Sequence, residues 1–327
     1  MKNQVLIITN KQDSHTDKVI KYLIKKNISV FRLNTEDLLI KYKINLSIGD
    51  NGNWFGTITD ELNRVLDLKT LKVAWLRKPK FDFASNYTKE ELGIKKFMVS
   101  EAKAFISILY SMSHITWINN PIIADGMKSK FQQLLLAKEL GVKIPKTLIT
   151  TVPNKAESFL EENGNRVLIK SIYTGNVTLH GRNQSIPSKL ITRNEFKKYY
   201  KNIELTPTQF QEYIEKNFEL RVTVIKNKVF AAKIESQLNE KTKIDWRKYT
   251  NLNPHSIFKL PKKIEKFCIK FIEQQKLIYG AIDFIVTPDN EYVFLENNPF
   301  GQYLWLEIET GLPLTKEIGD LLISYLE

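Results

Sequence analysis

The chain has 327 residues, of which 43% are hydrophobic and 26% charged, with 13 glycines and 11 prolines. This usage is typical of globular proteins and excludes collagen-like, low-complexity and disordered classes, while the length predicts two or three domains. The 49 Lys and Arg residues exceed the 36 Asp and Glu residues and give a formal charge of +13, which alone does not choose between nucleic acid, an anionic membrane and an acidic partner.

The sequence also predicts the cellular compartment. A single cysteine, Cys268, excludes an intramolecular disulfide and a cysteine-rich zinc site, so a reducing compartment is the simpler inference. No stretch approaches the ~18 consecutive apolar residues of a transmembrane helix, and the apolar run at the N-terminus is too short for a signal peptide. We expect a cytoplasmic protein with no membrane partner and, because no nucleic-acid-binding motif is recognisable, no nucleic-acid partner.

The first 120 residues alternate strand and helix patterns. Apolar runs predict strands and stripes of period 3.6 predict helices, so the order reads as βαβ followed by a further strand and a long helix. No G-x-G-x-x-G sequence follows the first strand, which argues against a dinucleotide site. We predict an α/β domain over residues 1–120. The runs lie at residues 5–8, 30–33 and 73–76, and the stripes at 19–24 and 102–109.

A second domain is predicted over residues 121–206. Asn119-Asn120-Pro121 interrupts the pattern, and a helical stripe then includes Phe131, Leu134 and Leu135. Residues 167–170 form a short strand that ends in Lys170, and a polar loop with Gly175 and Gly181 follows.

The remainder, residues 207–327, is predicted to be an α+β domain. Strand patterns recur at 219–225, 229–234, 281–286 and 292–295, and a helix carries Cys268 on its apolar stripe, where a cysteine is more often core than nucleophile. The polar segments around Pro207 and over residues 238–261 are predicted to be loops.

The strongest chemical signal is a pair of carboxylates on consecutive strands. Asp283 lies on one strand, and Glu296-Asn297-Asn298-Pro299 ends the next, so antiparallel pairing would place their oxygens side by side. Glu296 and Asn298 share one face of their strand, and Asn297 points away. Carboxylate and amide oxygens suit Mg²⁺, which is normally held by one or two carboxylates and substrate phosphates. The alternative is a hairpin whose polar residues only mark its ends.

Groups that could bind phosphate are present, although the chain has no P-loop. Lys130 at the start of a helix and Lys170 at the end of a strand can act as point charges on phosphates, or can be solvated surface lysines. The four histidines, His15, His114, His180 and His255, are far apart without H-x-x-x-H spacing, so a zinc site is not expected.

An ordered set of motifs resembles the ATP-grasp superfamily. The set is KFQQL from Lys130, GVKIP from Gly141, VLIK ending at Lys170, QEYI from Gln211, ELRV from Glu219, then Asp283 and the ENNP sequence from Glu296. The tail NPFGQYLWLEIETGLP, with the sequences DWR from Asp245 and WLRKP from Trp75, resembles the ATP-grasp peptide maturases of the microviridin and plesiocin type, the graspetide synthetases. The resemblance implies an ATP-grasp fold with an N-terminal Rossmann-like pre-ATP-grasp domain, a central domain and a C-terminal α+β domain.

The resemblance also implies a ligand and a role for each matching position. ATP would lie between the central and C-terminal domains, with two Mg²⁺ ions. The segment from Tyr173 to Asn183 corresponds to the lid of the family but is poor in glycine, so no phosphate contact is assigned to it. The assigned residues are Lys130 and Lys170 on the phosphates, Gln211, Glu212, Tyr213 and Ile214 at the adenine, Glu219 and the helper Glu215 at the ribose, Asp283, Glu296 and Asn298 on the metal, and Arg221 or Arg247 at the transferred phosphate or the substrate carboxylate.

The function implied by the resemblance is macrocyclisation of a ribosomal precursor peptide with a leader and an acidic core. Asp or Glu side chains would be activated as acyl phosphates and condensed with Ser or Thr hydroxyls or Lys amines to give esters or amides. Two alternatives stay open: a ligase of the same fold that adds a free amino acid to a carboxylate, and a peptide-binding protein that has lost catalysis. A homodimer is possible, because family members are often dimers.

Overall fold

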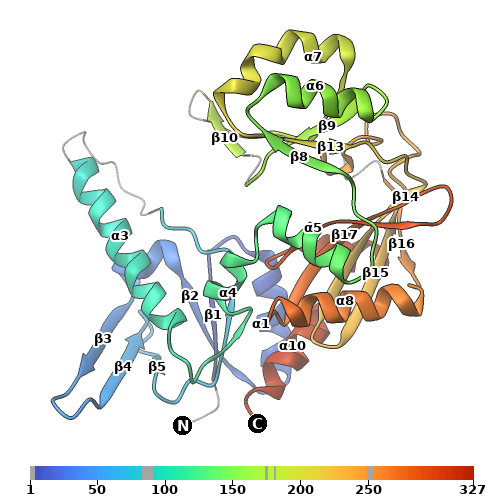
Figure 1. The fold of residues 1–327 in the computed structure, drawn as a ribbon. Coiled ribbons are helices and arrows are strands. Elements are labelled where there is room, and N and C mark those ends of the chain that lie inside the picture. The colour runs from blue at the N-terminus through green and yellow to red at the C-terminus, as the bar shows by residue number, and fades with distance from the viewer. Residues whose placement is uncertain (1–3, 83–90, 174–175, 180–181, 249–252) are drawn as a thin grey trace. The chain divides into compact units, whose positions relative to one another are not determined.

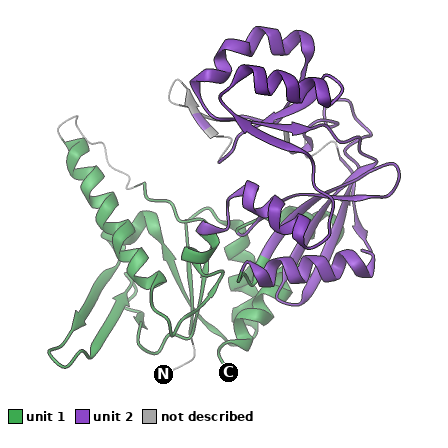
Figure 2. Cartoon of the chain, viewed as in Figure 1, with its two compact units in different colours: residues 1–125, 276–279, 300–327 green, residues 126–275, 280–299 purple. Residues whose placement is uncertain are grey.

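The structure is a computed structural model that describes residues 4–82, 91–173, 176–179, 182–248 and 253–327 (Figure 1). The chain divides into two compact units (Figure 2). Unit 1 comprises residues 1–125, 276–279 and 300–327, and unit 2 comprises residues 126–275 and 280–299. No helix in the described part of the chain is long and apolar enough to span a membrane. The three-domain division, with boundaries after residues 120 and 206, stays a prediction.

A four-stranded parallel sheet in the order β2-β1-β6-β7 forms the centre of unit 1. Residues 5–8 of its strand β1 are all fully buried, as expected for a parallel strand with both faces covered. The strands and helices predicted in this region are confirmed. The strands are β1 (Gln4–Thr9), β2 (Ser29–Asn34), β6 (Val73–Leu76) and β7 (Thr116–Ile118), and the longer helices of unit 1 are α1 (Ser14–Lys25), α3 (Glu91–Tyr110) and α10 (Leu314–Ser324).

Helix α10, from the end of the chain, packs against α1 near its start. The Tyr22 hydroxyl donates a hydrogen bond to Asp320 at 2.5 Å. At Gly319 a Cβ atom would lie 2.3 Å from the Tyr22 ring, so this close approach requires glycine. No local pattern in the sequence indicates this contact, because its partners are almost 300 residues apart.

Unit 1 also contains an antiparallel sheet that we did not predict. It pairs β3, β4 and β5 in that order, and Ile58 and Leu66 from it join the hydrophobic core with Leu6 and Ile8 of β1. The signal was present, because residues 43–48 alternate polar and apolar side chains. These strands are β3 (Lys43–Ile48), β4 (Trp54–Thr59) and β5 (Val65–Asp67). Short helices also occur: η1 (Thr35–Asp37), α2 (Leu38–Lys41), α4 (Pro121–Gly126) and α9 (Leu304–Thr310).

Unit 2 begins with helix α5 (Lys130–Glu139) and an antiparallel sheet in the order β12-β9-β13-β8. The helix is confirmed, but Phe131 and Leu135 of its predicted stripe are exposed and only Leu134 is buried. Leu160 and Phe196, from two further helices, pack with Phe210 of the sheet. The elements are β8 (Thr147–Thr150), α6 (Pro153–Glu162), β9 (Arg166–Lys170), β12 (Lys189–Thr192), α7 (Arg193–Tyr199), η2 (Tyr200–Leu205) and β13 (Thr208–Glu212).

The second sheet of unit 2 has five strands in the order β16-β15-β14-β17-β18. Helix α8 contributes its apolar stripe to the core, and Cys268 is fully buried there, as predicted. The strands predicted in this region are confirmed. The elements are β14 (Phe218–Ile225), β15 (Lys228–Ile234), β16 (His255–Phe258), α8 (Lys262–Gln274), β17 (Tyr279–Val286) and β18 (Tyr292–Asn298).

Two predicted loops contain regular structure. The segment after Lys170 includes an antiparallel hairpin of β10 (Asn176–Leu179) and β11 (Arg182–Ser185). The segment 238–261 includes η3 (Trp246–Lys248) and β16. Both segments are polar. Strands β10, β11 and β16 are defined by their pairing with a neighbouring strand and not by an apolar pattern in the sequence. Gly175, His180 and Gly181 lie outside the described residues.

Candidate active site

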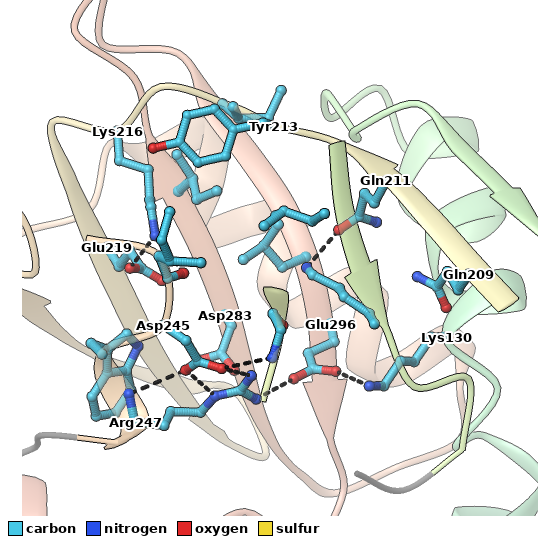
Figure 3. Close-up of a pocket in the computed structure, with 18 of the residues that line it drawn as sticks. Lys130, Gln209, Gln211, Tyr213, Lys216, Glu219, Asp245, Arg247, Asp283 and Glu296 are labelled. Atoms are coloured by element: carbon cyan, nitrogen blue, oxygen red, sulfur yellow. Dashed lines mark hydrogen bonds and ion pairs between the residues drawn. The ribbon is translucent and has the colours of Figure 1, made fainter. Parts of the chain in front are cut away.

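A polar pocket in unit 2 is lined by residues from both sheets and spans about 720 Å³, which includes space open to solvent (Figure 3). Four Lys or Arg residues face four Asp or Glu residues in its lining, and apolar side chains complete the wall. The lining comprises Lys130, Leu134, Leu168, Lys170, Ser188, Gln209, Gln211, Tyr213, Ile214, Lys216, Glu219, Ile244, Asp245, Trp246, Arg247, Asp283, Ile285, Leu295 and Glu296.

The two predicted metal-binding carboxylates are direct neighbours across strands β17 and β18, since Asp283 pairs with Glu296 in the antiparallel register. The ladder shifts between Asp283 and Phe284, and such an irregularity re-aims the side chains next to it. The predicted pairing of these strands is therefore confirmed. Glu296 and Asn298 also line a neighbouring cavity with Lys128 and Lys130.

Arg221 on β14 donates from one nitrogen to both oxygens of Asp283, at 2.9 and 3.0 Å. Burial raises the pKa of Asp283 to about 6 against the opposing charge of Arg221. Arg221 is engaged with this carboxylate and is not part of the pocket lining. Its predicted contact with phosphate or substrate stays a prediction.

Two cations beside Glu296 shift its pKa in the direction opposite to that of Asp283. Lys130 lies 3.1 Å from it and Arg247 lies 3.5 Å from it. Burial by itself would raise the pKa of Glu296, but Lys130, Arg247 and Lys170 more than offset this effect and hold that pKa below its usual value. Glu296 is therefore ionised at neutral pH, as a metal ligand must be.

Arg247, the second predicted arginine, is oriented by Asp245. Two parallel contacts of 2.8 Å join the guanidinium nitrogens Nε and Nη2 to the two carboxylate oxygens (Figure 3). Burial would raise the pKa of Asp245, but its hydrogen bonds with Arg247 hold it below the usual value. A fork-to-fork pair of this kind fixes the plane of the guanidinium and leaves Nη1 directed at Glu296.

Lys170 extends from the end of β9 into the same pocket and donates to Gln211 at 2.6 Å. Burial lowers the pKa of Lys170 to about 8, so its ammonium is held in a poorly solvated place. Gln211 in turn donates to Thr147 at 3.0 Å, which fixes the direction of its amide. Lys130 and Lys170, predicted to bind phosphate, are thus brought to one pocket.

The segment predicted to meet adenine and ribose reaches the pocket only in part. Gln211, Tyr213 and Ile214 line it. The Glu212 carboxylate accepts from the Lys146 backbone N–H, and exposed Glu215 pairs with Arg166. Their roles as nucleotide contacts stay predictions.

Glu219 is in the pocket lining and forms a buried ion pair with Lys216 at 2.8 Å. We did not predict Lys216, Gln209 or Trp246 as site residues. Lys216 lies three residues before Glu219 in the sequence, and an ion-pair spacing was the available signal. Its direction into the pocket depends on the turn between β13 and β14.

A buried amide network supports the carboxylates from behind. Gln133, one turn after Lys130 on α5, exchanges two hydrogen bonds with the backbone of Asn297, at 2.8 and 2.9 Å. The Asn297 side chain points away from the pocket, as predicted, and donates to Gln275 at 2.9 Å. One helix therefore sets both the cation beside Glu296 and the backbone position of the next residue.

This donor set fits a nucleotide with Mg²⁺. No group of three or more His, Cys, Asp and Glu side chains that could hold a metal ion occurs in the described part of the chain. Two adjacent carboxylates with lysines beside them match the usual Mg²⁺ site, in which phosphate oxygens of the substrate supply further ligands.

Comparisons with known proteins agree with the ATP-grasp resemblance over nearly the whole chain. Residues 4–124 match the MvdD pre-ATP-grasp domain and residues 125–322 match the RimK-like ATP-grasp domain. The structure of a RiPP-associated ATP-grasp ligase from Chryseobacterium gregarium, in complex with ADP and a leader and core peptide, is 28% identical, with a TM-score of 0.89 over 98% of this chain and 97% of that chain.

Two further structures share the fold. Macrocyclase MdnC from Microcystis aeruginosa MRC, bound with precursor peptide MdnA, is 26% identical with a TM-score of 0.85 over 98% of this chain and 99% of MdnC. The ATP-grasp ligase PsnB, complexed with minimal precursor, Mg and ADP, is 16% identical with a TM-score of 0.75 over 100% of this chain and 99% of PsnB.

A curated protein, the tRNA(Ile)-lysidine synthase of Malacoplasma penetrans (strain HF-2), is 24% identical over 276 residues, which are 80% of this chain and 81% of that protein. This identity is lower than that of the Chryseobacterium and Microcystis ligases, which match nearly the full chain.

Proposed function

Because the chain belongs to the RimK-like ATP-grasp family and is similar over nearly its full length to macrocyclase MdnC, we propose that it is an ATP-dependent ligase that macrocyclises a ribosomal precursor peptide. The observation that carries the proposal is the gathering of Lys130, Lys170 and Arg247 around the carboxylates Asp283 and Glu296 in one pocket. The Chryseobacterium ligase in complex with ADP, leader and core peptide supports the choice of substrate.

The reaction begins with activation of a carboxylate. A peptide Asp or Glu side chain attacks the γ-phosphorus of ATP, the bond from that phosphorus to the β,γ-bridging oxygen breaks, and an acyl phosphate and ADP result. Charge spreads over the phosphoryl oxygens in this step, so catalysis depends on positioning and electrostatic stabilisation. Lys130, Lys170 and the Nη1 group of Arg247 supply cations fixed in place by Glu296, Gln211 and Asp245.

Two Mg²⁺ ions are proposed at Asp283, Glu296 and Asn298, where they would neutralise charge on the phosphates. Lys130 and Arg247 neutralise Glu296 in the structure described here. The Lys130 and Arg247 side chains thereby stay in the lining of the pocket where the phosphates are proposed to bind.

The second step forms the ring. A Ser or Thr hydroxyl, or a Lys amine, of the same peptide attacks the acyl carbon, and inorganic phosphate leaves as the nucleophile loses its proton. The peptide loses one water, about 18 Da, for each ester or amide formed, while ATP becomes ADP and phosphate. Tyr213, Ile214, Gln211 and Glu219 are proposed to hold the adenosine.

The experiment is the intact mass of a candidate precursor peptide incubated with the protein, Mg²⁺ and ATP, with an ATP-free control. We expect losses of about 18 Da per ring. Gain of an amino-acid residue when free amino acids are supplied would contradict cyclisation and indicate a ligase that adds amino acids. Absence of any ADP release with acidic peptides would contradict ligase activity itself.

A further inference from the structure

A second charged cluster lies in unit 1, around Arg77 at the end of β6. Arg77 is only 4% exposed. Its Nη1 nitrogen donates to the carbonyl oxygens of Phe300 and Gly301, at 3.3 and 3.4 Å. Its Nε and Nη2 nitrogens are buried and have no hydrogen-bond partner among the described residues. A buried donor of a charged group left unpaired is costly, so this edge of the guanidinium needs an explanation.

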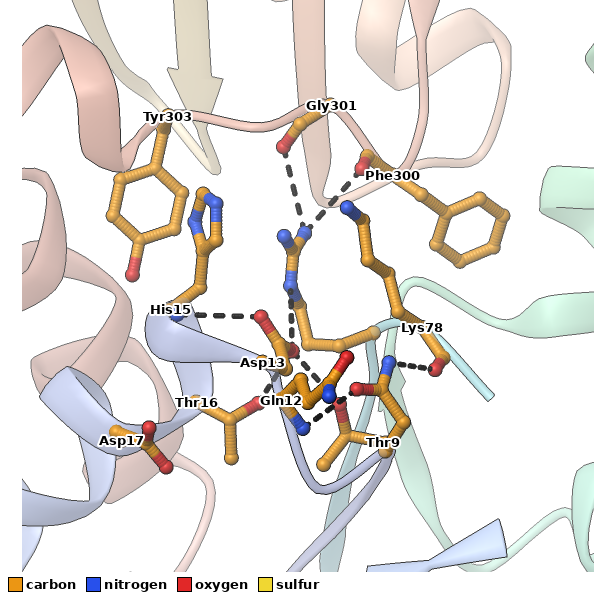
Figure 4. Close-up of polar contacts among 12 residues, drawn as sticks. Thr9, Gln12, Asp13, His15, Thr16, Asp17, Lys78, Phe300, Gly301 and Tyr303 are labelled. Carbon is orange, nitrogen blue, oxygen red and sulfur yellow. Dashed lines mark hydrogen bonds and ion pairs between the residues drawn. The ribbon is translucent and has the colours of Figure 1, made fainter. Parts of the chain in front are cut away.

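The neighbouring carboxylate does not satisfy it. Asp13 Oδ2 lies 3.8 Å from Arg77 Nε, beyond hydrogen-bond distance. That oxygen already accepts from Thr9 at 2.8 Å and from Thr16 at 2.7 Å, and the other accepts from the His15 backbone N–H (Figure 4). Asp13 is thereby fixed as the cap of helix α1 and is not free to move to Arg77.

Two further groups complete the cluster. The His15 ring packs edge-on against Tyr303, with ring centres 4.7 Å apart, and its buried Nδ1 has no hydrogen-bond partner in the described part of the chain. Burial and the charge of Arg77 lower the pKa of His15 to about 4, so the imidazole is neutral and can donate one N–H. Lys78, next in sequence, lies in the same cluster (Figure 4) and its side chain is exposed.

The charges of this cluster do not balance. Arg77 and Lys78 are cations and Asp13 is an anion that acts on both, so these three groups carry one net positive charge. A singly charged planar anion would balance it. Because Nε and Nη2 of a guanidinium form a fork that matches the two oxygens of a carboxylate, the unpaired edge of Arg77 has the shape for that group.

We propose that Arg77, His15 and Lys78 form a carboxylate-binding site in unit 1, and that its occupant is an acidic side chain of the peptide substrate. The first half of this proposal stands on the unpaired donors and the charge, and only the source of the carboxylate rests on the proposed function. The site would hold an acidic side chain of the peptide other than the one being activated.

The test is direct binding, which does not require catalysis. The Nε–Hε resonance of Arg77, assigned by its loss in Arg77→Lys, is followed in the ¹⁵N-labelled full chain while N-acetyl-glutamate α-amide is added. We expect a saturable shift with this probe and none with N-acetyl-glutamine α-amide, which has the same shape without the charge. Lys78→Gln should weaken the affinity about fivefold, and the matched variant Lys80→Gln, at an exposed lysine two residues later, should not.

Three results would overturn the proposal: no shift of the Arg77 resonance, equal shifts with the glutamate and glutamine probes, or tighter binding of inorganic phosphate than of the glutamate probe. Since Arg77 also holds the carbonyls of Phe300 and Gly301, Arg77→Lys could unfold the site, and the Lys78→Gln and His15→Gln variants keep the test independent of it. A failure of ring formation in the mass experiment would leave this binding result readable, and the two proposals can therefore fail separately.

Discussion

Two charged clusters among the described residues differ in how their cations are paired. In the pocket of unit 2, four cationic residues face four carboxylates, and Lys130, Lys216 and Arg247 are each within 3.5 Å of one. In the cluster of unit 1, Arg77 has no carboxylate of a described residue within hydrogen-bond distance, and Lys78 adds a second cation.

This difference teaches how each cluster can take a ligand. In unit 2 most charged groups already have a partner of opposite charge, so an incoming phosphate or cation would compete with these ion pairs. In unit 1 an anion would meet donors that have no partner to give up. The first arrangement suits catalysis that proceeds in steps, and the second suits simple holding.

The largest effect is expected at Glu296. Replacing it with Gln removes the negative charge that pairs with Lys130 and Arg247 and is proposed to bind Mg²⁺. ATP turnover should therefore fall about 1,000-fold, while peptide binding persists. ADP release and peptide affinity measure the two effects. Glu291→Gln, a matched change at an exposed ion pair earlier on the same hairpin, should leave both near wild type, and turnover retained in Glu296→Gln would contradict the metal assignment.

The free energy of unfolding should depend on pH because of His15 in the cluster of unit 1. The pKa of His15 is about 4 in the folded chain and 6.5 for an ordinary histidine, so the unfolded state binds the extra proton between these values. Stability from this group is therefore complete above pH 6.5 and is lost as the pH falls toward 4, by about 3 kcal/mol in total. Chemical unfolding at pH 7 and pH 4.5 measures it. His15→Gln should reduce the dependence, and an unchanged pH profile in that variant would contradict it.

Loss of Gln133 should weaken the support of the pocket. Gln133→Ala leaves the buried N–H and C=O of Asn297 without their partner, so the free energy of unfolding should fall by about 2 kcal/mol. The concentration of Mg²⁺ needed for half-maximal turnover should rise as well. Gln132→Ala, at an exposed position on the same helix, is the control, and equal effects of the two changes would sink the positioning role.

The smallest effect concerns Lys170, whose pKa is about 8. Phosphate binds the protonated amine, so ADP affinity should fall up to about tenfold as the pH rises from 7 to 9. Lys170→Arg keeps its charge throughout this range and should lose the pH dependence, and Lys170→Met should bind weakly at both values. Calorimetric titration with ADP and Mg²⁺ measures this, and the same pH dependence in Lys170→Arg as in the wild type would assign it to another group.

Much of the site could be predicted because its chemistry is local in the sequence. Asp283 and Glu296 lie on strands joined by a short turn, so their pairing follows from hairpin geometry. Lys130 and Lys170 could be singled out because they stand at the start of a helix and the end of a strand. Predicting that Arg221 would pair with Asp283 was not possible, because the neighbour relation of β14 and β17 joins positions 62 residues apart.

By itself, the sequence determined the βαβ order at the start of the chain, the strands at residues 219–225, 229–234, 281–286 and 292–295, the ATP-grasp resemblance and the residue types of the pocket. These features depend on apolar periodicity and short connections, which act within a few residues. Tertiary structure alone decided that α10 packs on α1, that Gln133 supports Asn297 and that two donors of Arg77 find no partner among the residues the structure describes. Each of these depends on burial by segments distant in the chain, and burial fixes which polar groups must find a partner.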